Sequence, residues 1–325
     1  MFLATSLLII GLLLVVYSAD RLVFSASLLC HRLGVSPLII GMTVVTVGTS
    51  LPEIIVALSA TLRDQGSLAV GTAIGSNITN ILLILGLAAT LHPLKVHSAL
   101  LRREIPLMLL VTLIAGYILW DGELTRSEGV VLLIIAAIYL LLTVKFAQHA
   151  HHKENDNLTR EQLAELPCEG SLPVALLWLG VALIIMPIAT HMVIDNATVL
   201  ANAFNISEFL VGVTVLAIGT SLPELATAIA GARKGEDNIA IGNLIGANIF
   251  NITIVLGLPA LGYHRDLDPL MIRYDYGVLL LVSLVFALLC WRRSGEISKC
   301  AGALLLTGFI VWLILRLAGF FPFVE

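Results

Sequence analysis

Charged residues are scarce in this chain. Of its 325 residues only 12% are Asp, Glu, Lys or Arg, whereas 58% are hydrophobic, and the mean hydropathy is +1.00. Soluble globular domains carry about twice that share of charged residues. The composition therefore excludes a soluble domain and predicts an integral membrane protein that is surrounded by a lipid bilayer and has no nucleic-acid partner.

Cysteine is equally rare, and some enzyme motifs are missing. The four cysteines show no paired spacing, so we expect neither a disulfide nor a cysteine metal site. There is no HExxH zinc motif and no set of nucleophile and base residues, which argues against an intramembrane hydrolase. We expect a protein that is not an enzyme and carries no cofactor.

Apolar stretches recur along the whole chain. A helix needs about 20 apolar residues to cross a bilayer. Ten stretches approach or exceed this length: 2–29, 37–61, 68–91, 105–120, 129–146, 172–201, 209–232, 239–261, 276–291 and 301–319. The sequence therefore predicts an all-α polytopic membrane protein with ten transmembrane helices.

The basic residues predict the orientation. If the loops after helices 1, 3, 5, 7 and 9 share one side, thirteen of the eighteen Lys and Arg residues lie on that side. Basic residues are enriched on the cytoplasmic side, so both termini are expected to face outward. In this orientation the long polar segment 148–171 is expected to be a cytoplasmic linker. Its histidines, His149, His151 and His152, fit a transition-metal site less well than a solvated linker, because no cysteine or carboxylate is arranged around them.

The linker separates two copies of one segment. Shifting the sequence by 171 positions aligns 41–89 with 212–260 without a gap, and 22 of the 49 positions are identical. The first copy begins in helix 2 and the second in helix 7, and five crossings reverse the direction of the chain. We therefore expect two inverted five-helix halves, 1–147 and 172–325, which is a common design of secondary transporters.

Each copy contains the sequence GTSLPE. Pro52 cannot donate to the carbonyl of Gly48, so helix 2 should be interrupted there and leave carbonyl oxygens near Thr46 to Gly48 without partners. Glu53 follows the interruption, and the same reasoning applies around Glu224 in helix 7. Two carboxylates among hydroxyl, amide and carbonyl oxygens suit a hard cation such as calcium, and intramembrane carboxylates are usually functional.

Other interpretations remain open for some of these residues. A proline can produce only a kink, Ser and Thr can bond to their own helix backbone, and a single buried glutamate can be protonated and structural. Asn80 and Asn251 follow their glutamates by 27 residues and can be cation ligands or interhelical contacts. We assign the repeated glycines to helix packing, and Asp20, His191 and Asp195 to solvated helix ends.

The two copies resemble the α-repeats of the calcium/cation antiporter superfamily, specifically its sodium/calcium exchanger branch. The resemblance rests on GTSLPE with the trailing GSN or GAN element in both copies. It implies calcium and sodium as transported ions and a location in the bacterial inner membrane with periplasmic termini. The ion ligands that it implies are Glu53, Glu224, Thr46, Thr49, Ser50, Ala217, Thr220, Ser221, Ser76, Asn80 and Asn251.

The second copy departs from the family pattern. Ala247 lacks a hydroxyl, and Asn251 stands where some exchangers carry aspartate, which affects the expected sodium sites and coupling ratio. We expect a sodium/calcium antiporter that works by alternating access. A proton/calcium exchanger is the nearest alternative, although its GNxxE arrangement is absent. A cation channel would also use carboxylates and carbonyls, and saturable flux that depends on a countercation would distinguish it.

Overall fold

The computed structural model describes residues 1–33, 35, 37–62, 66–96, 100–152, 171–203, 217–262, 272–291 and 295–317. The chain forms two compact units, and each combines segments from both predicted halves. Unit 1 comprises Met1–Pro52 and Tyr139–Gly246, and unit 2 comprises Glu53–Ile138 and Ala247–Glu325. The division into two sequential halves follows the sequence repeat and stays a prediction.

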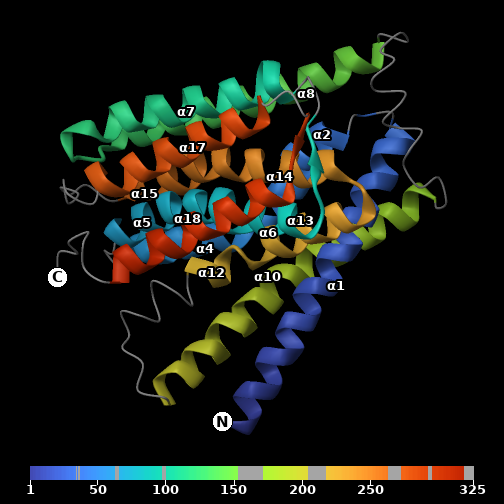
Figure 1. The fold of residues 1–325 in the computed structure, drawn as a ribbon, viewed down its shortest axis with the longest axis horizontal. Coiled ribbons are helices and arrows are strands. Elements are labelled where there is room, and N and C mark those ends of the chain that lie inside the picture. The colour runs from blue at the N-terminus through green and yellow to red at the C-terminus, as the bar shows by residue number, and fades with distance from the viewer. Residues whose placement is uncertain are drawn as a thin grey trace. The chain divides into compact units, whose positions relative to one another are not determined.

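Unit 1 is built around two long helices, α1 (Phe2–Leu33) and α10 (Leu172–Ala203), which lie side by side (Figure 1). Tyr17 and Trp178 meet edge to face between them, with ring centroids 6.1 Å apart. Their core contacts bury residues such as Leu22 and Met186. The remaining elements of unit 1 are α2 (Pro37–Ile40), η1 (Gly41–Val45), α3 (Thr46–Thr49), α12 (Ala217–Thr220), α13 (Leu222–Lys234), the start of α4 (Leu51–Leu62), and parts of α8 (Arg126–His152) and α14 (Asp237–Phe250).

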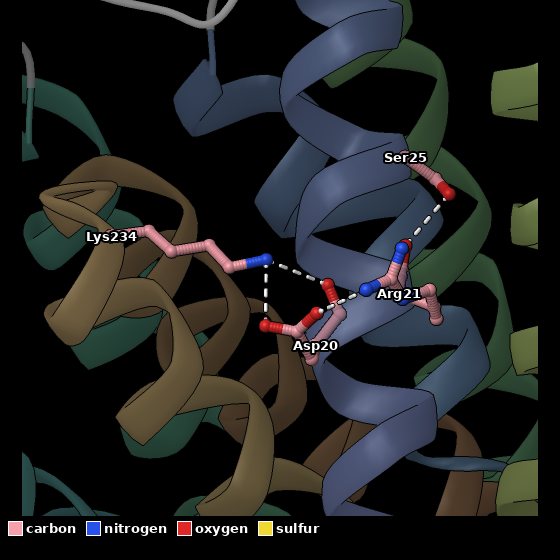
Figure 2. Close-up of polar contacts among 4 residues, drawn as sticks. All are labelled: Asp20, Arg21, Ser25 and Lys234. Atoms are coloured by element: carbon pink, nitrogen blue, oxygen red, sulfur yellow. Dashed lines mark hydrogen bonds and ion pairs between the residues drawn. The ribbon is translucent and has the colours of Figure 1, made fainter.

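The end of α13 is attached to α1 by an ion pair (Figure 2). Lys234 Nζ lies 2.8 Å from Asp20 Oδ1 and also donates to the Asp20 carbonyl at 3.0 Å. Arg21 Nη2 lies 3.2 Å from the other carboxylate oxygen of Asp20. Gly235 follows with φ +74°, the left-handed conformation that ends a helix with glycine. Asp20 is thus both partly exposed and paired, not merely solvated.

Unit 2 contains the middle of the first predicted half and the end of the second. The elements that begin in it are α5 (Gly66–Thr79), η2 (Asn80–Leu85), α6 (Gly86–Leu91), β1 (Leu94–Lys95), η3 (Leu100–Glu104), α7 (Ile105–Ile118), η4 (Leu119–Asp121), α8, η6 (Asn251–Val255), α15 (Leu256–Gly262), η7 (Ile272–Tyr276), α17 (Gly277–Cys290), β2 (Glu296–Ile297) and α18 (Lys299–Leu317). It also holds α4 from Glu53 onward and the end of α14.

Close backbone contacts hold unit 2 together. A Cβ atom added to Gly302 of α18 would lie 2.7 Å from the carbonyl of Gly86 in α6, so glycine permits this approach. The Tyr276 hydroxyl donates to the carbonyl of Thr112, which joins η7 to α7. Strands β1 and β2 pair antiparallel, with Leu94 opposite Ile297. A buried ion pair joins Arg316 to Asp275 at 2.7 Å.

Seven described helices are long and apolar enough to span a membrane, and the bent pair Pro37–Thr49 and Leu51–Leu58 makes an eighth candidate. Tyr274–Cys290 is a shorter apolar helix. The remaining predicted span, 209–232, begins outside the described residues and is represented by α12 and α13. Leu and Ile side chains project from α1, α10 and α18, as expected of surfaces in contact with lipid. The multi-pass helical class is confirmed, whereas the inverted ten-helix layout stays a prediction.

Secondary structure repeats well beyond the duplicated sequence. Helices α4 and α13 begin 171 positions apart (222 − 51), and so do α5 and α14 (237 − 66). Outside the aligned block, α1 and α10 both have 32 residues and begin 170 positions apart (172 − 2), while α7 and α17 both have 14 and begin 172 apart (277 − 105). The repeat therefore includes helices whose sequences no longer show it.

The predicted linker begins later than expected. Helix α8 continues to His152, so 148–152 are helical, and 153–170 lie outside the described residues. The side chains of the three histidines also lie outside the description. Their interpretation as solvated residues stays a prediction.

Candidate cation-binding site

The predicted interruptions in the repeated helices are present. In the first copy the chain leaves the helix at Ser50, with φ −85° and ψ 5°, between α3 and α4. In the second copy Ser221 has φ −87° and ψ 6°, between α12 and α13. The helical segments on the two sides of Ser50 differ in direction by 43°. Both breaks lie two residues before the proline, which cannot donate to the preceding turn.

One detail of the predicted break is wrong. The Thr46 carbonyl was expected to lack a partner, but it accepts a hydrogen bond from the Ser50 backbone N–H at 2.9 Å. The reason is that the missing proline N–H affects the carbonyl four residues earlier, which is Gly48. Thr46 can still contribute its hydroxyl group, whereas its carbonyl is engaged in the last turn of α3.

In unit 1, polar side chains gather around Glu224 on the first turn of α13. Ser50 Oγ donates to Glu224 Oε1 at 3.2 Å, and the Thr49 side chain lies close enough to interact with this carboxylate. Glu224 is 1% exposed. Its second oxygen, Oε2, and the hydroxyl of Ser221 are buried without a hydrogen-bond partner among the described residues. Within the described part of the chain, unit 1 therefore has two buried oxygens without a hydrogen-bond partner.

Asn243 of α14 completes this group. Thr49 Oγ1 lies 3.1 Å from Asn243 Oδ1, and Thr46 Oγ1 lies 3.3 Å from the same atom. Thr46 Oγ1 is also 3.2 Å from the Asn243 carbonyl oxygen. A Cβ atom on nearby Gly246 would lie 2.3 Å from Thr46 Oγ1. We refer to Thr46, Thr49, Ser50, Glu224 and Asn243 as the Glu224 cluster.

Unit 2 contains a second group, the asparagine cluster, which consists of Asn77, Asn80 and Asn248. Asn80 Nδ2 donates to Asn248 Oδ1 at 3.0 Å, and Asn77 Nδ2 donates to the Asn248 carbonyl at 3.0 Å. Asn80 and Asn251 each begin a π-helical segment, a feature that is frequent at functional sites. The amide oxygens of Asn77, Asn80 and Asn251 and the hydroxyl of Ser76 are buried and have no partner in the described parts of the chain.

The remaining predicted ligands occupy equivalent places. Glu53, on the first turn of α4 in unit 2, is 1% exposed, as Glu224 is in unit 1. Thr220 is buried in α12. The backbone of Ala217 begins α12, and its side chain lies outside the description. Apart from this side chain, the predicted ligands are all buried.

These groups have the chemistry of a hard-cation site. Carboxylate, hydroxyl and amide oxygens are the ligands that calcium prefers, usually six to eight of them. Among the described residues, no three His, Cys, Asp or Glu side chains are grouped as a metal site. Neutral oxygens would therefore have to supply most of the coordination around the two glutamates.

The sequence reasoning missed three polar residues. Asn77 and Asn248 are matched positions of the duplication, and that identity was the available signal. Asn243 is different, because the first copy has Thr72 at the equivalent position. Its contact partner Thr46 also differs between the copies, because the second copy has Ala217 at that position. Only the positions at which the two copies differ could therefore have indicated Asn243.

Comparison with known proteins agrees with the helical membrane fold. The profile of the family described as "Sodium/calcium exchanger protein" matches residues 3–145 and 174–318. The inner membrane protein YrbG of Escherichia coli is 67% identical over 313 residues, which cover 96% of each chain. The sodium/calcium exchanger MaX1 of Methanosarcina acetivorans is 30% identical over 341 residues, covering 95% of this chain and 97% of the relative.

A solved structure is also similar. The sodium-calcium exchanger NCX_Mj, soaked with sodium and calcium, superposes with a TM-score of 0.82 at 32% identity, covering 97% of this chain and 98% of that one. The two profile matches include both GTSLPE copies and nearly all the described helices. The chain is a multi-pass membrane protein of the calcium/cation antiporter superfamily and belongs to the sodium/calcium exchanger family.

Proposed function

We propose that this protein exchanges sodium for calcium across the membrane by alternating access. Glu53 and Glu224 bind the same calcium ion, and sodium ions compete for the same oxygens. The observation that carries the proposal is the burial of both glutamates, each on the first turn after an interrupted helix. A buried charge in a membrane is costly, and a divalent cation between two carboxylates would offset that cost.

Chain connectivity supports a shared ion. Ser50 Oγ donates to Glu224 Oε1 at 3.2 Å within unit 1. Glu53 follows Ser50 by only three residues, which span about 10 Å even when fully extended. The short connection between Ser50 and Glu53 is therefore compatible with the proposed shared ion.

The available oxygens support calcium as one substrate. Glu224 Oε2, Ser221 Oγ, Ser76 Oγ and the amide oxygens of Asn80 and Asn251 are buried without a partner among the described residues. Together with Glu53 they would provide enough ligands for calcium, which binds six to eight oxygens in flexible geometry. Asn248 would orient Asn80, because it accepts the amide N–H of that side chain.

Sodium as the countercation is supported by two observations. MaX1 and NCX_Mj carry the name sodium/calcium exchanger, and the GNxxE arrangement expected of a proton/calcium exchanger is absent. Sodium also prefers oxygen ligands, so it would compete with calcium for one set of groups. Ala247 and Asn251 supply no hydroxyl and no third carboxylate, so fewer groups are present to hold sodium in the second copy.

Alternating access is supported by the helix pair α1 and α10. They pack along each other within unit 1, and a Cβ atom on Gly11 of α1 would lie 3.2 Å from the carbonyl of Ala189 in α10. We propose that this pair moves as one body and exposes the site to each side in turn. The linker would be cytoplasmic and both termini periplasmic, in the inner membrane.

Flux measurements in proteoliposomes test the proposal. Calcium uptake should be driven by an outward sodium gradient, saturate with calcium, and stop when choline replaces sodium. Potassium and proton gradients, imposed one at a time, should not drive it. Uptake driven by a pH gradient alone would contradict sodium exchange and favour the proton alternative, while uptake without any countercation would identify a channel.

A further inference from the structure

The Glu224 cluster contains a contact that the duplicated sequence does not repeat. Thr46 is replaced by Ala217 in the second copy, and Asn243 has Thr72 as its counterpart in the first. These two mismatched residues contact each other in unit 1, with Asn243 Oδ1 3.3 Å from Thr46 Oγ1. Because two departures from the repeat meet at one point, the surroundings of Glu224 differ chemically from those of Glu53.

The side-chain oxygen and nitrogen of Asn243 differ in their hydrogen bonding. With Oδ1 facing Thr46 and Thr49, the Nδ2 group is buried and has no partner among the described residues. The oxygen and nitrogen of a primary amide occupy equivalent positions, so hydrogen bonding decides which of them faces the hydroxyls. A buried N–H group without a partner is rarer in proteins than an under-used carbonyl oxygen.

The opposite orientation satisfies more groups. The two N–H bonds of Asn243 then donate to Thr46 Oγ1 and Thr49 Oγ1. The Thr46 hydroxyl donates to the Gly41 carbonyl, which lies 2.9 Å away. The Thr49 hydroxyl also lies 3.4 Å from the Thr46 carbonyl. In this orientation it is available to donate to the Glu224 carboxylate, with which its side chain interacts. The result is a directed chain of donors from Asn243 through Thr49 to Glu224.

We infer that Asn243 is a positioning residue that acts on the Glu224 carboxylate through Thr49. Its amide fixes the Thr49 hydroxyl as a donor to Oε1, to which Ser50 also donates, because Oε2 has no hydrogen-bond partner among the described residues. The carboxylate is thereby held in one rotamer, with Oε2 directed to the ion. This inference rests on the proposed function and adds to it a reason why the two half-sites are not equivalent.

A double-mutant cycle on the full-length protein tests the inference. Calcium affinity of the purified protein is measured for Asn243→Leu, Thr49→Val and the double variant. Hydrogen bonds to charged groups are worth enough that each single change should weaken calcium binding about tenfold or more. If Asn243 acts through Thr49, the double variant should bind no more weakly than Thr49→Val alone.

Two further variants make the cycle specific. Thr49→Ser keeps the hydroxyl, so in that background Asn243→Leu should again weaken binding. Should Asn243→Leu fail to insert, Asn243→Thr copies the residue of the first repeat and is too short to reach both hydroxyls.

The outcomes separate the two proposals. Multiplicative losses for Asn243 and Thr49, or an Asn243→Leu protein with lower Tm and unchanged calcium affinity, would overturn the positioning role and leave the exchanger proposal standing. Absence of calcium binding by the wild type would contradict the proposed function itself, and the positioning role with it.

Discussion

The side-chain amide of Asn77 donates a 3.0 Å hydrogen bond to the backbone carbonyl of Asn248, its own counterpart 171 positions later in the second copy. Equivalent residues of the two repeats therefore meet within unit 2. Asn248 also accepts the amide N–H of Asn80. One residue of the second copy thus orients two polar residues of the first.

Replacing Asn248 with Leu should lower both stability and calcium affinity. The change leaves the buried amide of Asn80 without its acceptor, which should reduce the free energy of unfolding by about 1–2 kcal/mol. Thermal unfolding in detergent and calcium titration measure the two effects. Asn196→Leu is the matched control, because Asn196 bonds only to Met192 of its own helix in the contacts described. Equal Tm values for the two variants would contradict the prediction.

The equivalent glycines Gly75 and Gly246 should respond differently to alanine. A Cβ atom on Gly246 would lie 2.3 Å from Thr46 Oγ1 and 3.0 Å from the Met42 backbone, whereas one on Gly75 meets nothing within 4 Å among the residues that the structure describes. Gly246→Ala should destabilise the protein by about 1–3 kcal/mol. Gly75→Ala should be neutral or slightly stabilising, because alanine favours helix by about 1 kcal/mol over glycine. Similar unfolding temperatures for both would show that the close approach of α14 to η1 and α3 is unimportant.

Glu53→Gln or Glu224→Gln should abolish calcium exchange and leave membrane insertion and expression largely unchanged. Glutamine keeps an oxygen and nearly the same volume but removes one charge. An ion and a carboxylate about 4 Å apart interact by about 4 kcal/mol per unit of cation charge at an effective dielectric constant near 20. Divalent binding should therefore suffer more than monovalent binding.

Expression, gradient-driven calcium flux and calcium affinity are measured side by side on each glutamine variant. Glu128→Gln serves as the control, because Glu128 accepts hydrogen bonds from Thr125 at the start of α8 and is not a predicted ligand. Wild-type flux from either Glu53→Gln or Glu224→Gln at normal expression would remove that residue from the site.

The distribution of basic residues predicts that reporter fusions at Glu325 and within 148–170 lie on opposite sides of the membrane. The terminus should report the periplasm and the linker the cytoplasm, following the thirteen-to-five division of Lys and Arg. A periplasmic phosphatase and a cytoplasmic fluorescent protein give complementary signals. Both fusions on one side would contradict the inverted repeat.

The sequence was sufficient to predict the helical class and the interruptions before Pro52 and Pro223. Hydrophobicity and the missing proline N–H are local properties, so they can be read without knowing which helices touch. The π-helical segments at Asn80 and Asn251 were not predictable, because one extra residue in a turn leaves no mark on composition. Asn243 was missed for a different reason, because its role depends on which face of α14 packs against Thr46. In addition, an asparagine in a membrane helix can be either a site residue or an interhelical contact.

The π-helical segment η2 also sets the rotational phase of the helix that follows it. In an α-helix each residue advances by about 100°, so the wider turn at Asn80–Leu85 changes the direction in which every later side chain points. Asn77, before η2, and Asn80, at its first position, face Asn248; after η2, Gly86 faces Gly302 of α18. The π-helical turn in η2 thus rotates the later part of the span relative to the earlier part. One continuous span can therefore direct its polar residues to Asn248 and its small residues to α18.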